Sequence, residues 1–311
     1  MTAPAQAWFL VGPTAAGKTD IAHDLARSRG AWILSADSMT VYRGLDLGTA
    51  KPTAAQRAEV RYFGLDLRDP DQPFSVADFL EAARVAFAEA ESAGRPMIVV
   101  GGSGLYIRCL LQGLRPGAPA DAGLRAEAAD LLARCGLAAL QDQVRAQAPA
   151  HFAALADVEN PRRLIRAWEQ AAAGLPVEDT WQGPRPRLAG VRYGREELHR
   201  RIERRVAALF AAGLVEETRA LRARFPVWSD TAAQAIGYAE ALTHLENGVT
   251  VQQAMGRTAQ RTRQLARRQL TWFRHQAEVE WVEASPQMPL AAQVQAVGQA
   301  WERHGITTLR F

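Results

Sequence analysis

An eight-residue stretch near the N-terminus, GPTAAGKT at residues 12 to 19, constrains the fold more than any other feature of the sequence. It matches the phosphate-binding pattern G-x-x-x-x-G-K-[ST] at every fixed position. The apolar run Trp8 to Val11 precedes it and the helix-like stretch Lys18 to Arg29 follows it, so a strand, a loop and a helix are expected in that order. We therefore predict a diphosphate- or nucleotide-binding P-loop, made of Gly12, Pro13, Thr14, Ala15, Ala16, Gly17, Lys18 and Thr19.

The residue types of this loop suit an anion. Backbone N–H groups and the following helix N-terminus attract phosphate, Lys18 can reach the outer phosphates, and the Thr19 hydroxyl can ligate Mg²⁺. Such loops occur in ATP-binding proteins of many kinds, so the motif indicates a diphosphate without saying which one. Asp37, after the next apolar run, could be a metal ligand, a base or a helix N-cap.

Two further apolar runs predict strands, Trp32 to Leu34 and Met97 to Val100. Between them, Val76 to Ala93 is expected to be a helix, opened by a capping box between Ser75 and Asp78. Strands that alternate with helices indicate an α/β fold with a parallel sheet covered on both faces, like that of P-loop NTPases.

Ligands of such sheets bind beyond the carboxyl ends of the strands. Three strand ends here carry residues suited to a site: 12–19, Asp37 with Ser38, and Gly101 to Gly104. We expect these three segments to lie together.

The composition changes to Pro, Gly and Ala after Leu114, and a second loop-like stretch runs from Gly183 to Arg187. The sequence between them is alanine-rich and helical in character. We predict a helical insertion domain at 116–184 inside a discontinuous core formed by 1–115 and 185–311.

The returning core is basic. The alternating stretch Leu188 to Tyr193 is followed by two expected long helices, Leu198 to Phe225 and Val251 to Arg274. From Arg185 to Arg274 there are 17 arginines against 8 carboxylates, although the net charge of the whole chain is only +4. This excess suits a phosphate-bearing partner, and it equally suits solvated helix faces.

Other chemistries have little support. No apolar run is long enough to cross a bilayer and no signal peptide is visible, so a cytoplasmic protein without membrane contact is expected. Cys109 and Cys135 lack metal-ligand spacing and are interpreted as packing residues. The basic residues include only two lysines, Lys18 and Lys51. Either a compact charge is needed at these positions or chance has left two lysines there.

A longer pattern carries a family resemblance. The run from Ser35 to Pro52, SADSMTVYRGLDLGTAKP, resembles the signature S-A-D-S-x-Q-V-Y-[RK]-x-x-D-I-G-T-A-K-P of the tRNA dimethylallyltransferase (IPP transferase) family. Other blocks resemble that family in the same order: GGSGLY at 101–106, NPRRLIRA at 160–167, RIERRV at 201–206, GLVEE at 213–217, QAIGY at 234–238 and TRQLARRQLTWF at 262–273. Together the blocks cover nearly the whole chain.

The resemblance implies an activity: transfer of a dimethylallyl group from dimethylallyl diphosphate to the exocyclic amine of the adenosine 3′ of the anticodon in tRNA, with release of diphosphate. It implies a P-loop that holds the diphosphate with Mg²⁺, and a monomer. Asp37 would be the general base, Thr19 a catalytic residue and metal ligand, and Arg205 a catalytic residue that helps to hold the diphosphate. The residues implied to contact the anticodon stem-loop of tRNA are Asp37, Ser38, Met39, Thr40, Ser103, Arg125, Arg162, Arg163, Leu164, Ile165, Arg166, Gln234, Ala235, Ile236, Gly237, Tyr238 and Ala239.

The chain departs from the family pattern at two places. Thr40 stands where the family has Gln, and VRYF at 60–63 replaces V-P-H-H, so roles of that amide and those histidines cannot be transferred. Ser103 replaces Thr and keeps a hydroxyl. Trp272 and Phe273 are interpreted as core residues.

Three other functions share some of these features. An ATP-dependent small-molecule kinase has the same loop and sheet but needs no basic insertion. An adenylate isopentenyltransferase uses the same chemistry on free nucleotides. A non-catalytic tRNA-binding protein would not need both the P-loop and Asp37.

Overall fold

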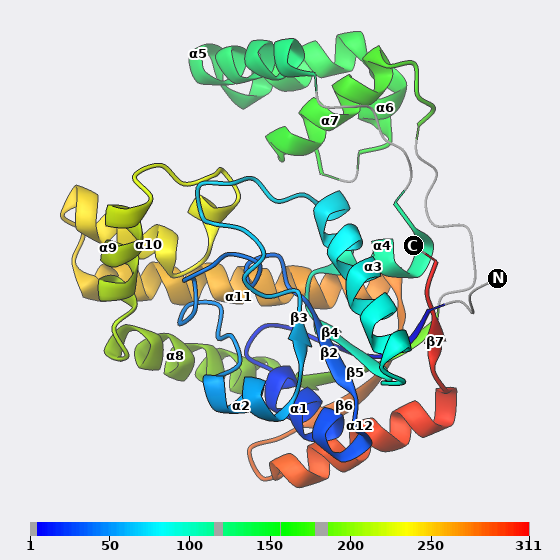
Figure 1. The fold of residues 1–311 in the computed structure, drawn as a ribbon. Helices are drawn as coiled ribbons and strands as arrows, with labels where there is room; N and C mark the ends of the chain where they lie inside the picture. The colour runs from blue at the N-terminus through cyan, green and yellow to red at the C-terminus, as the bar shows by residue number, and fades with distance from the viewer. Residues whose placement is uncertain (1–4, 115–120, 156, 178–185, 311) are drawn as a thin grey trace. The chain divides into compact units, whose positions relative to one another are not determined.

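The computed structural model describes residues 5–114, 121–155, 157–177 and 186–310 (Figure 1). The chain forms two compact units, one from 1–114 with 185–311 and one from 115–184. The sequence-based ranges are 1–115 with 185–311, and 116–184. Most of the Pro/Gly/Ala stretch after Leu114, and Gly183 to Arg185 of the second expected loop, lie outside the described residues.

The larger unit contains a seven-stranded sheet. Six strands are parallel in the order β3-β2-β4-β1-β5-β6, and β7 pairs antiparallel with β1. The strands are β1 (Gln6–Val11), β2 (Trp32–Ala36), β3 (Tyr62–Phe63), β4 (Met97–Gly101), β5 (Arg187–Tyr193), β6 (Glu278–Ala284) and β7 (Thr307–Thr308). This confirms the predicted α/β class.

The strand order explains where the site forms. β1 lies between β4 and β5, with Leu10 opposite both Val100 and Ala189, and β2 pairs with the other side of β4. Parallel neighbours end at the same edge of a sheet, so the segments after β1, β2 and β4 meet there as predicted.

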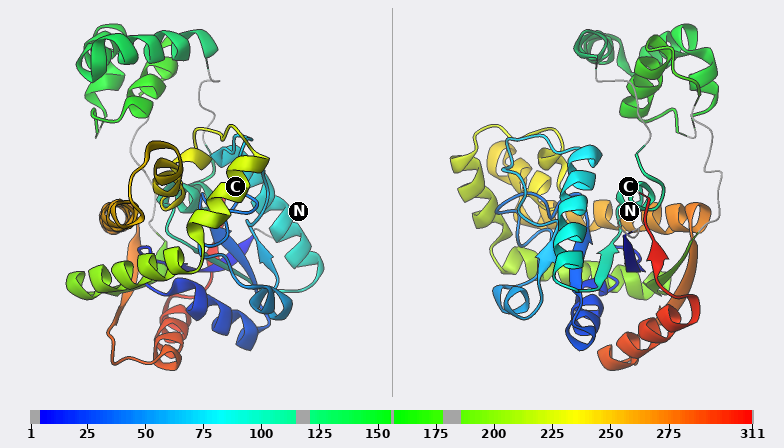
Figure 2. Two further views of the ribbon diagram at one scale, coloured as in Figure 1. Left: turned by 90° about the vertical axis from the view of Figure 1, so that its left-hand side faces the viewer. Right: turned by 45° about the vertical axis from the view of Figure 1, so that its right-hand side comes forward.

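Helices cover the sheet. Those of the larger unit are α1 (Lys18–Arg29), α2 (Ala54–Glu59), α3 (Val76–Ser92), α4 (Gly104–Gln112), α8 (Arg195–Ala211), α9 (Leu214–Arg224), α10 (Tyr238–Asn247), α11 (Val251–Gln276) and α12 (Leu290–His304), with a 3₁₀ turn η1 (Ala232–Gln234). In Figures 1 and 2, α1 and α12 lie side by side on one face of the sheet, and α3 and α4 pack together on the other. α1 has the predicted bounds.

The capping box of α3 is present. Ser75 Oγ accepts from Asp78 N at 3.2 Å, and the Asp78 carboxylate accepts from Ser75 N at 2.8 Å. The expected single helix Leu198 to Phe225 is wrong, because Gly213 (φ 100°) separates α8 from α9. Its left-handed backbone lets the chain turn at no steric cost. The C-terminal β6, α12 and β7 were not expected.

The smaller unit is helical, with α5 (Ala122–Gln147), α6 (Pro149–Ala153) and α7 (Pro161–Ala172). α5 is broken at Gly136 (φ 80°). A separate apolar core joins these helices: Ala128, Leu140, Val144, Ala148, Leu164, Ala167 and Trp168. This unit therefore has a core of its own.

Within the described ranges, no helix is long and apolar enough to span a membrane. Cys109 is buried in α4, but Cys135 is exposed, so its interpretation as a packing residue is wrong.

Candidate active site

The loop after β1 is tight. Gly17 immediately precedes α1 in the left-handed region (φ 84°), and Gly12 has a φ of 147°. A Cβ at Gly12 would lie 2.3 Å from the carbonyl oxygen of Val191 on β5. Both positions therefore require glycine, and the backbone of the loop lies directly against the neighbouring strand.

Two side chains from distant helices hold this loop. Gln269 of α11 accepts a hydrogen bond from Thr14 N (2.8 Å) and donates one to Gly102 O (3.1 Å). Arg201 of α8 donates from Nε to Ala15 O (2.9 Å). Sequence reasoning assigned neither residue a role, although both lie in blocks that resemble the family, because a motif does not reveal which distant loop a side chain reaches.

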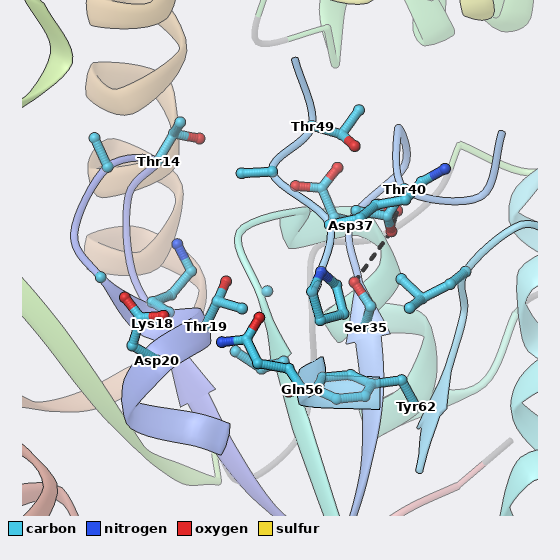
Figure 3. Close-up of a pocket in the computed structure, with 18 of the residues that line it drawn as sticks. Thr14, Lys18, Thr19, Asp20, Ser35, Asp37, Thr40, Thr49, Gln56 and Tyr62 are labelled. Atoms are coloured by element: carbon cyan, nitrogen blue, oxygen red, sulfur yellow. Dashed lines mark hydrogen bonds between the residues drawn. The ribbon is translucent and has the colours of Figure 1, made fainter. Parts of the chain in front are cut away.

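A cavity of about 280 Å³ opens beside the loop (Figure 3). Five predicted loop residues line it: Thr14, Ala15, Gly17, Lys18 and Thr19. The other three, Gly12, Pro13 and Ala16, are buried behind them. Figure 3 shows Lys18 and Thr19 on one side of the cavity and Asp37 with Thr40 on the other.

The charged residues that line this cavity are Lys18, Lys51, Arg205, Asp20 and Asp37. Lys18 Nζ donates to Pro13 O at 2.7 Å, and Arg205 Nη2 donates to Gly48 O at 3.4 Å. Burial lowers the pKa of Lys18 to about 8; the charge of Asp37 raises this pKa, and the charge of Arg205 lowers it further. Burial also lowers the pKa of Arg205, and Asp37 opposes this shift. An anion bound here would stabilise both charged forms.

Asp37 follows β2 and does not cap a helix. Its Oδ1 accepts from Met39 N at 2.9 Å, while Ser38 N donates to Ser103 Oγ at 3.2 Å. The carboxylate stays accessible, since it lines the small cavity and a second, larger one. This geometry leaves the base and metal-ligand interpretations open and removes the N-cap.

The larger cavity measures about 510 Å³ and has an apolar lining that includes Met39, Leu209, Ile236 and Trp272. It shares four lining residues with the small one: Thr14, Asp37, Thr49 and Arg205. Besides Asp37, six residues predicted to contact tRNA line it: Ser38, Met39, Ser103, Gln234, Ala235 and Ile236. The fold thus brings the segment after β2, the start of α4 and the turn before α10 around one opening.

A family model described as IPP transferase matches residues 40–276. The chain belongs to the IPP transferase family. A tRNA dimethylallyltransferase of Geobacillus kaustophilus (strain HTA426) is 38% identical over 93% of this chain and 94% of its own length. One from Anaeromyxobacter sp. (strain K) is 42% identical over 88% of this chain and 91% of its own length.

Solved structures agree in fold. The full-length tRNA isopentenylpyrophosphate transferase of Bacillus halodurans superimposes with a TM-score of 0.68 at 34% identity, covering 96% of this chain and 98% of that protein. A eukaryotic dimethylallyltransferase acting on tRNA shares the fold with a TM-score of 0.71 at 18% identity, covering 97% of this chain and 81% of that one.

The family signature forms a loop after β2, and side chains of α9 and α10 hydrogen-bond to its backbone. Tyr238 is fully buried; its hydroxyl donates to Glu217 and accepts from Gly48 N at 3.0 Å. Glu217 also accepts from the backbone N–H groups of Asp46 and Leu47. Burial raises the pKa of Tyr238, and Glu217 raises it further. The Tyr238 side chain thus supports the loop, and its predicted contact with tRNA stays a prediction, as do those of buried Gly237 and half-buried Ala239.

The second lysine of the chain lies in this IPP transferase signature. The Lys51 side chain is 1% exposed, and its ammonium donates to Tyr42 O (2.5 Å), Asp46 Oδ1 (2.7 Å) and Asp66 Oδ1 (2.7 Å). Burial alone would raise the pKa of Asp66, but Lys51 and Arg57 outweigh it and lower that pKa. Three acceptors around one nitrogen suit a compact ammonium better than a planar guanidinium.

Two residues that depart from the IPP transferase pattern, Thr40 and Tyr62, line the small cavity. Thr40 is buried, with Oγ1 within 3.1 Å of Ser35 Oγ, Asp37 O and Gly64 O. Its hydroxyl therefore stabilises the loop from inside. Tyr62 lines the small cavity, and its hydroxyl lies 2.9 Å from His23 Nδ1.

The interpretation of the aromatic pair on α11 as core is half correct. Phe273 is fully buried, as expected, whereas Trp272 lines the larger cavity, so its assignment to the core is wrong. A Cβ at Gly104 would lie 2.3 Å from the Trp272 ring. The ring therefore packs directly on the start of α4 and forms part of the cavity wall.

The predicted tRNA residues of the insertion fall into three groups. Leu164 is buried in the insertion core and Ile165 packs against it. Arg162 and Arg163 are exposed at the start of α7. Arg125 and Arg166 form ion pairs with Glu169, at 2.7 Å and 3.2 Å. Only the arginines present polar side chains to solvent.

Proposed function

We propose that this chain is a tRNA dimethylallyltransferase, which transfers the dimethylallyl group of dimethylallyl diphosphate to the exocyclic amine of the adenosine 3′ of the anticodon and releases diphosphate. One observation carries the proposal: a polar cavity at the phosphate loop and a larger apolar cavity meet at Asp37 and Arg205. Membership of the IPP transferase family and the names of its relatives support it.

In this proposal the small cavity binds the leaving group. As the C–O bond to the allylic carbon breaks, negative charge accumulates on the diphosphate. The loop N–H groups, Lys18 and Arg205 stabilise that charge more in the transition state than in the ground state. The lowered pKa of Lys18 supports this role, because a bound anion would stabilise the protonated form and raise that pKa again.

The amine of adenine is a weak nucleophile because its lone pair is delocalised into the ring. Asp37 accepts the amine proton while the nitrogen forms its bond to the allylic carbon. The adenine must leave the anticodon-loop stack to reach this carboxylate, and unpaired loop bases are the least costly to extrude. The larger cavity supports this arrangement, since it opens on Asp37 and has apolar walls suited to a flat base.

Mg²⁺ is part of the proposal. The Thr19 hydroxyl lines the small cavity and is a hard oxygen donor of the kind that Mg²⁺ prefers. No group of three His, Cys, Asp or Glu side chains in the described residues could hold a metal. This suits a metal bound largely through the diphosphate, where it would neutralise part of the leaving-group charge.

The acceptor is an anticodon stem-loop. Residues lining the larger cavity would surround the base, and the arginines at 125, 162, 163 and 166 would contact the phosphates. A basic surface that binds mainly through phosphates serves many tRNAs with one protein. We further propose that the enzyme is a cytoplasmic monomer.

Incubation with dimethylallyl diphosphate, Mg²⁺ and either unmodified tRNA or AMP, followed by nucleoside mass analysis, tests the function. Prenylated adenosine in tRNA alone is expected. A prenylated AMP product would indicate an adenylate isopentenyltransferase, and ATP turnover without prenylation a kinase. Binding of tRNA with no product at all would indicate a non-catalytic protein.

A further inference from the structure

One carboxylate of the insertion is buried although it carries a charge. The Glu169 side chain on α7 is 1% exposed and follows two core residues, Ala167 and Trp168. A buried carboxylate is costly unless several donors satisfy it, so its partners indicate why it is there.

The donors come from three places in the insertion. Arg125 on α5 donates from Nε to Oε1 (2.7 Å) and from Nη2 to Oε2 (3.4 Å), a two-point contact. Arg166, one turn before Glu169, donates from Nη1 to Oε2 (3.2 Å), and Asp121 N donates to Oε1 (3.1 Å). Burial alone would raise the pKa of Glu169, but the two arginines outweigh it and lower that pKa. The carboxylate is therefore charged and saturated.

The arginines, in contrast, are only half covered. The Arg125 side chain is 53% exposed and that of Arg166 is 38% exposed. A guanidinium has five N–H donors, so Arg125 retains donors beyond the two bound to Glu169. Arg162, one turn earlier on the same face of α7 as Arg166, is exposed and has no ion-pair partner in the described part of the chain.

An ordinary surface ion pair looks different. On α5, Asp130 and Arg134 pair with side-chain exposures of 57% and 70%, so solvent reaches both partners. At Glu169 the acid lies behind the arginines and the cations face outward. Such a pair organises its cations without covering them.

We propose that Glu169 is a positioning residue for tRNA binding: it fixes the guanidinium groups of Arg125 and Arg166 in one orientation, so that the outward N–H groups of Arg125 meet a phosphate of the RNA beside the positive charge of Arg166. The inference rests on the proposed function, because it needs tRNA as the ligand. Its benefit is preorganisation, since two flexible side chains are ordered before tRNA arrives.

Loss of charge and loss of positioning predict opposite changes in tRNA affinity for one substitution at Glu169. Glu169→Gln removes a negative charge beside the arginines, so a simple field effect tightens tRNA binding and steepens its salt dependence. Loss of positioning weakens binding and speeds dissociation. Each arginine that must be ordered on binding costs a factor of roughly 2 to 12 in affinity, so a loss of about five- to tenfold or more is expected.

The experiment measures affinity and dissociation rate for an unmodified anticodon stem-loop RNA, by fluorescence anisotropy and stopped flow over a salt series. Asp130→Asn is the matched control, since it removes an exposed carboxylate from the same unit. Thermal unfolding by circular dichroism confirms that each variant is folded at the assay temperature. Should Glu169→Gln unfold, Glu169→Asp, which keeps the charge but is too short to reach both arginines, replaces it.

A second arm separates positioning from a general structural role. In an Arg125→Gln/Arg166→Gln background, Glu169→Gln should have little further effect on tRNA binding, because the groups it positions are gone. Unchanged or tighter binding of the single variant, or an undiminished loss in that background, would overturn the inference. Failure of the unsubstituted protein to bind tRNA would instead overturn the proposed function.

Discussion

Two regions of the molecule present positive charge suited to phosphate, and they do so in opposite ways. Lys18 and Arg205 are largely covered by protein in the wall of a small cavity, and Asp37 acts electrostatically on both. Arg162 and Arg163 are exposed on a helix. Charges in a water-poor site interact strongly and titrate abnormally, whereas exposed charges are screened by salt. The core should therefore respond to pH and the insertion to ionic strength.

The largest effect is expected where the shielded charges meet. Asp37→Asn keeps the size and most hydrogen bonds of the side chain but removes the basic site, so the chemical step should slow by about 10² to 10⁴. Single-turnover rates with saturating tRNA and dimethylallyl diphosphate, measured across a magnesium titration, check this. Recovery of the rate at high Mg²⁺ would mean that Asp37 is a metal ligand and not the base.

Loss of a cavity cation or of the predicted metal ligand should be nearly as severe. Lys18→Ala and Thr19→Ala should slow dimethylallyl transfer by roughly 10² to 10³, because each removes stabilisation of the leaving group. Affinity for tRNA in a gel-shift titration should stay within about twofold of the parent, on the basis that exposed and shielded sites act independently. Arg27→Ala, an exposed position on the same helix, serves as control. A matching loss of tRNA affinity would contradict the separation of the two regions.

The lowered pKa of Lys18 predicts pH-dependent anion binding. With a pKa of about 8, the free enzyme loses the Lys18 proton as pH rises through that value, whereas a bound diphosphate retains it. Binding of inorganic diphosphate should therefore take up a proton above about pH 8, and affinity should fall by up to about tenfold per pH unit.

Isothermal titration in two buffers of different ionisation enthalpy measures the proton uptake directly. Lys18→Arg, which stays charged, should show no such uptake. An affinity change between pH 7 and pH 9.5 that is the same in the parent and in Lys18→Arg would indicate that Lys18 does not contact the anion.

The smallest effect is expected on the exposed side. Arg162→Ala/Arg163→Ala should weaken tRNA binding and reduce the log–log salt slope by about 0.7 to 0.9 for each RNA phosphate that the protein no longer neutralises. Arg166 is left intact because it belongs to the Glu169 cluster. Arg134→Ala removes an exposed arginine from the same unit as control. An unchanged slope in the double variant would mean that these arginines form only a solvated helix face and do not contact RNA phosphates.

Local features were predictable. The strand, loop and helix around 12–19 and the Ser75 capping box follow from short sequence patterns, because neighbouring residues alone satisfy them. The boundary between core and insertion was predicted from a change in composition. Composition gave no sign of β6, α12 and β7 at the end of the chain. Gly213 shows the limit of periodicity: the apolar spacing continues across it, while one left-handed residue divides the helix.

The sequence by itself determined the chemistry available to this protein: a phosphate loop, a carboxylate after the second strand and an arginine-rich second half. Only the tertiary structure decided how these groups work together. In the folded protein Gln269 hydrogen-bonds to Thr14 and Gly102. Trp272 lines a cavity instead of lying in the core, and Glu169 is buried beneath two arginines. The reason is physical: a motif records interactions among neighbours in sequence, whereas burial and long-range hydrogen bonds exist only once distant helices have packed.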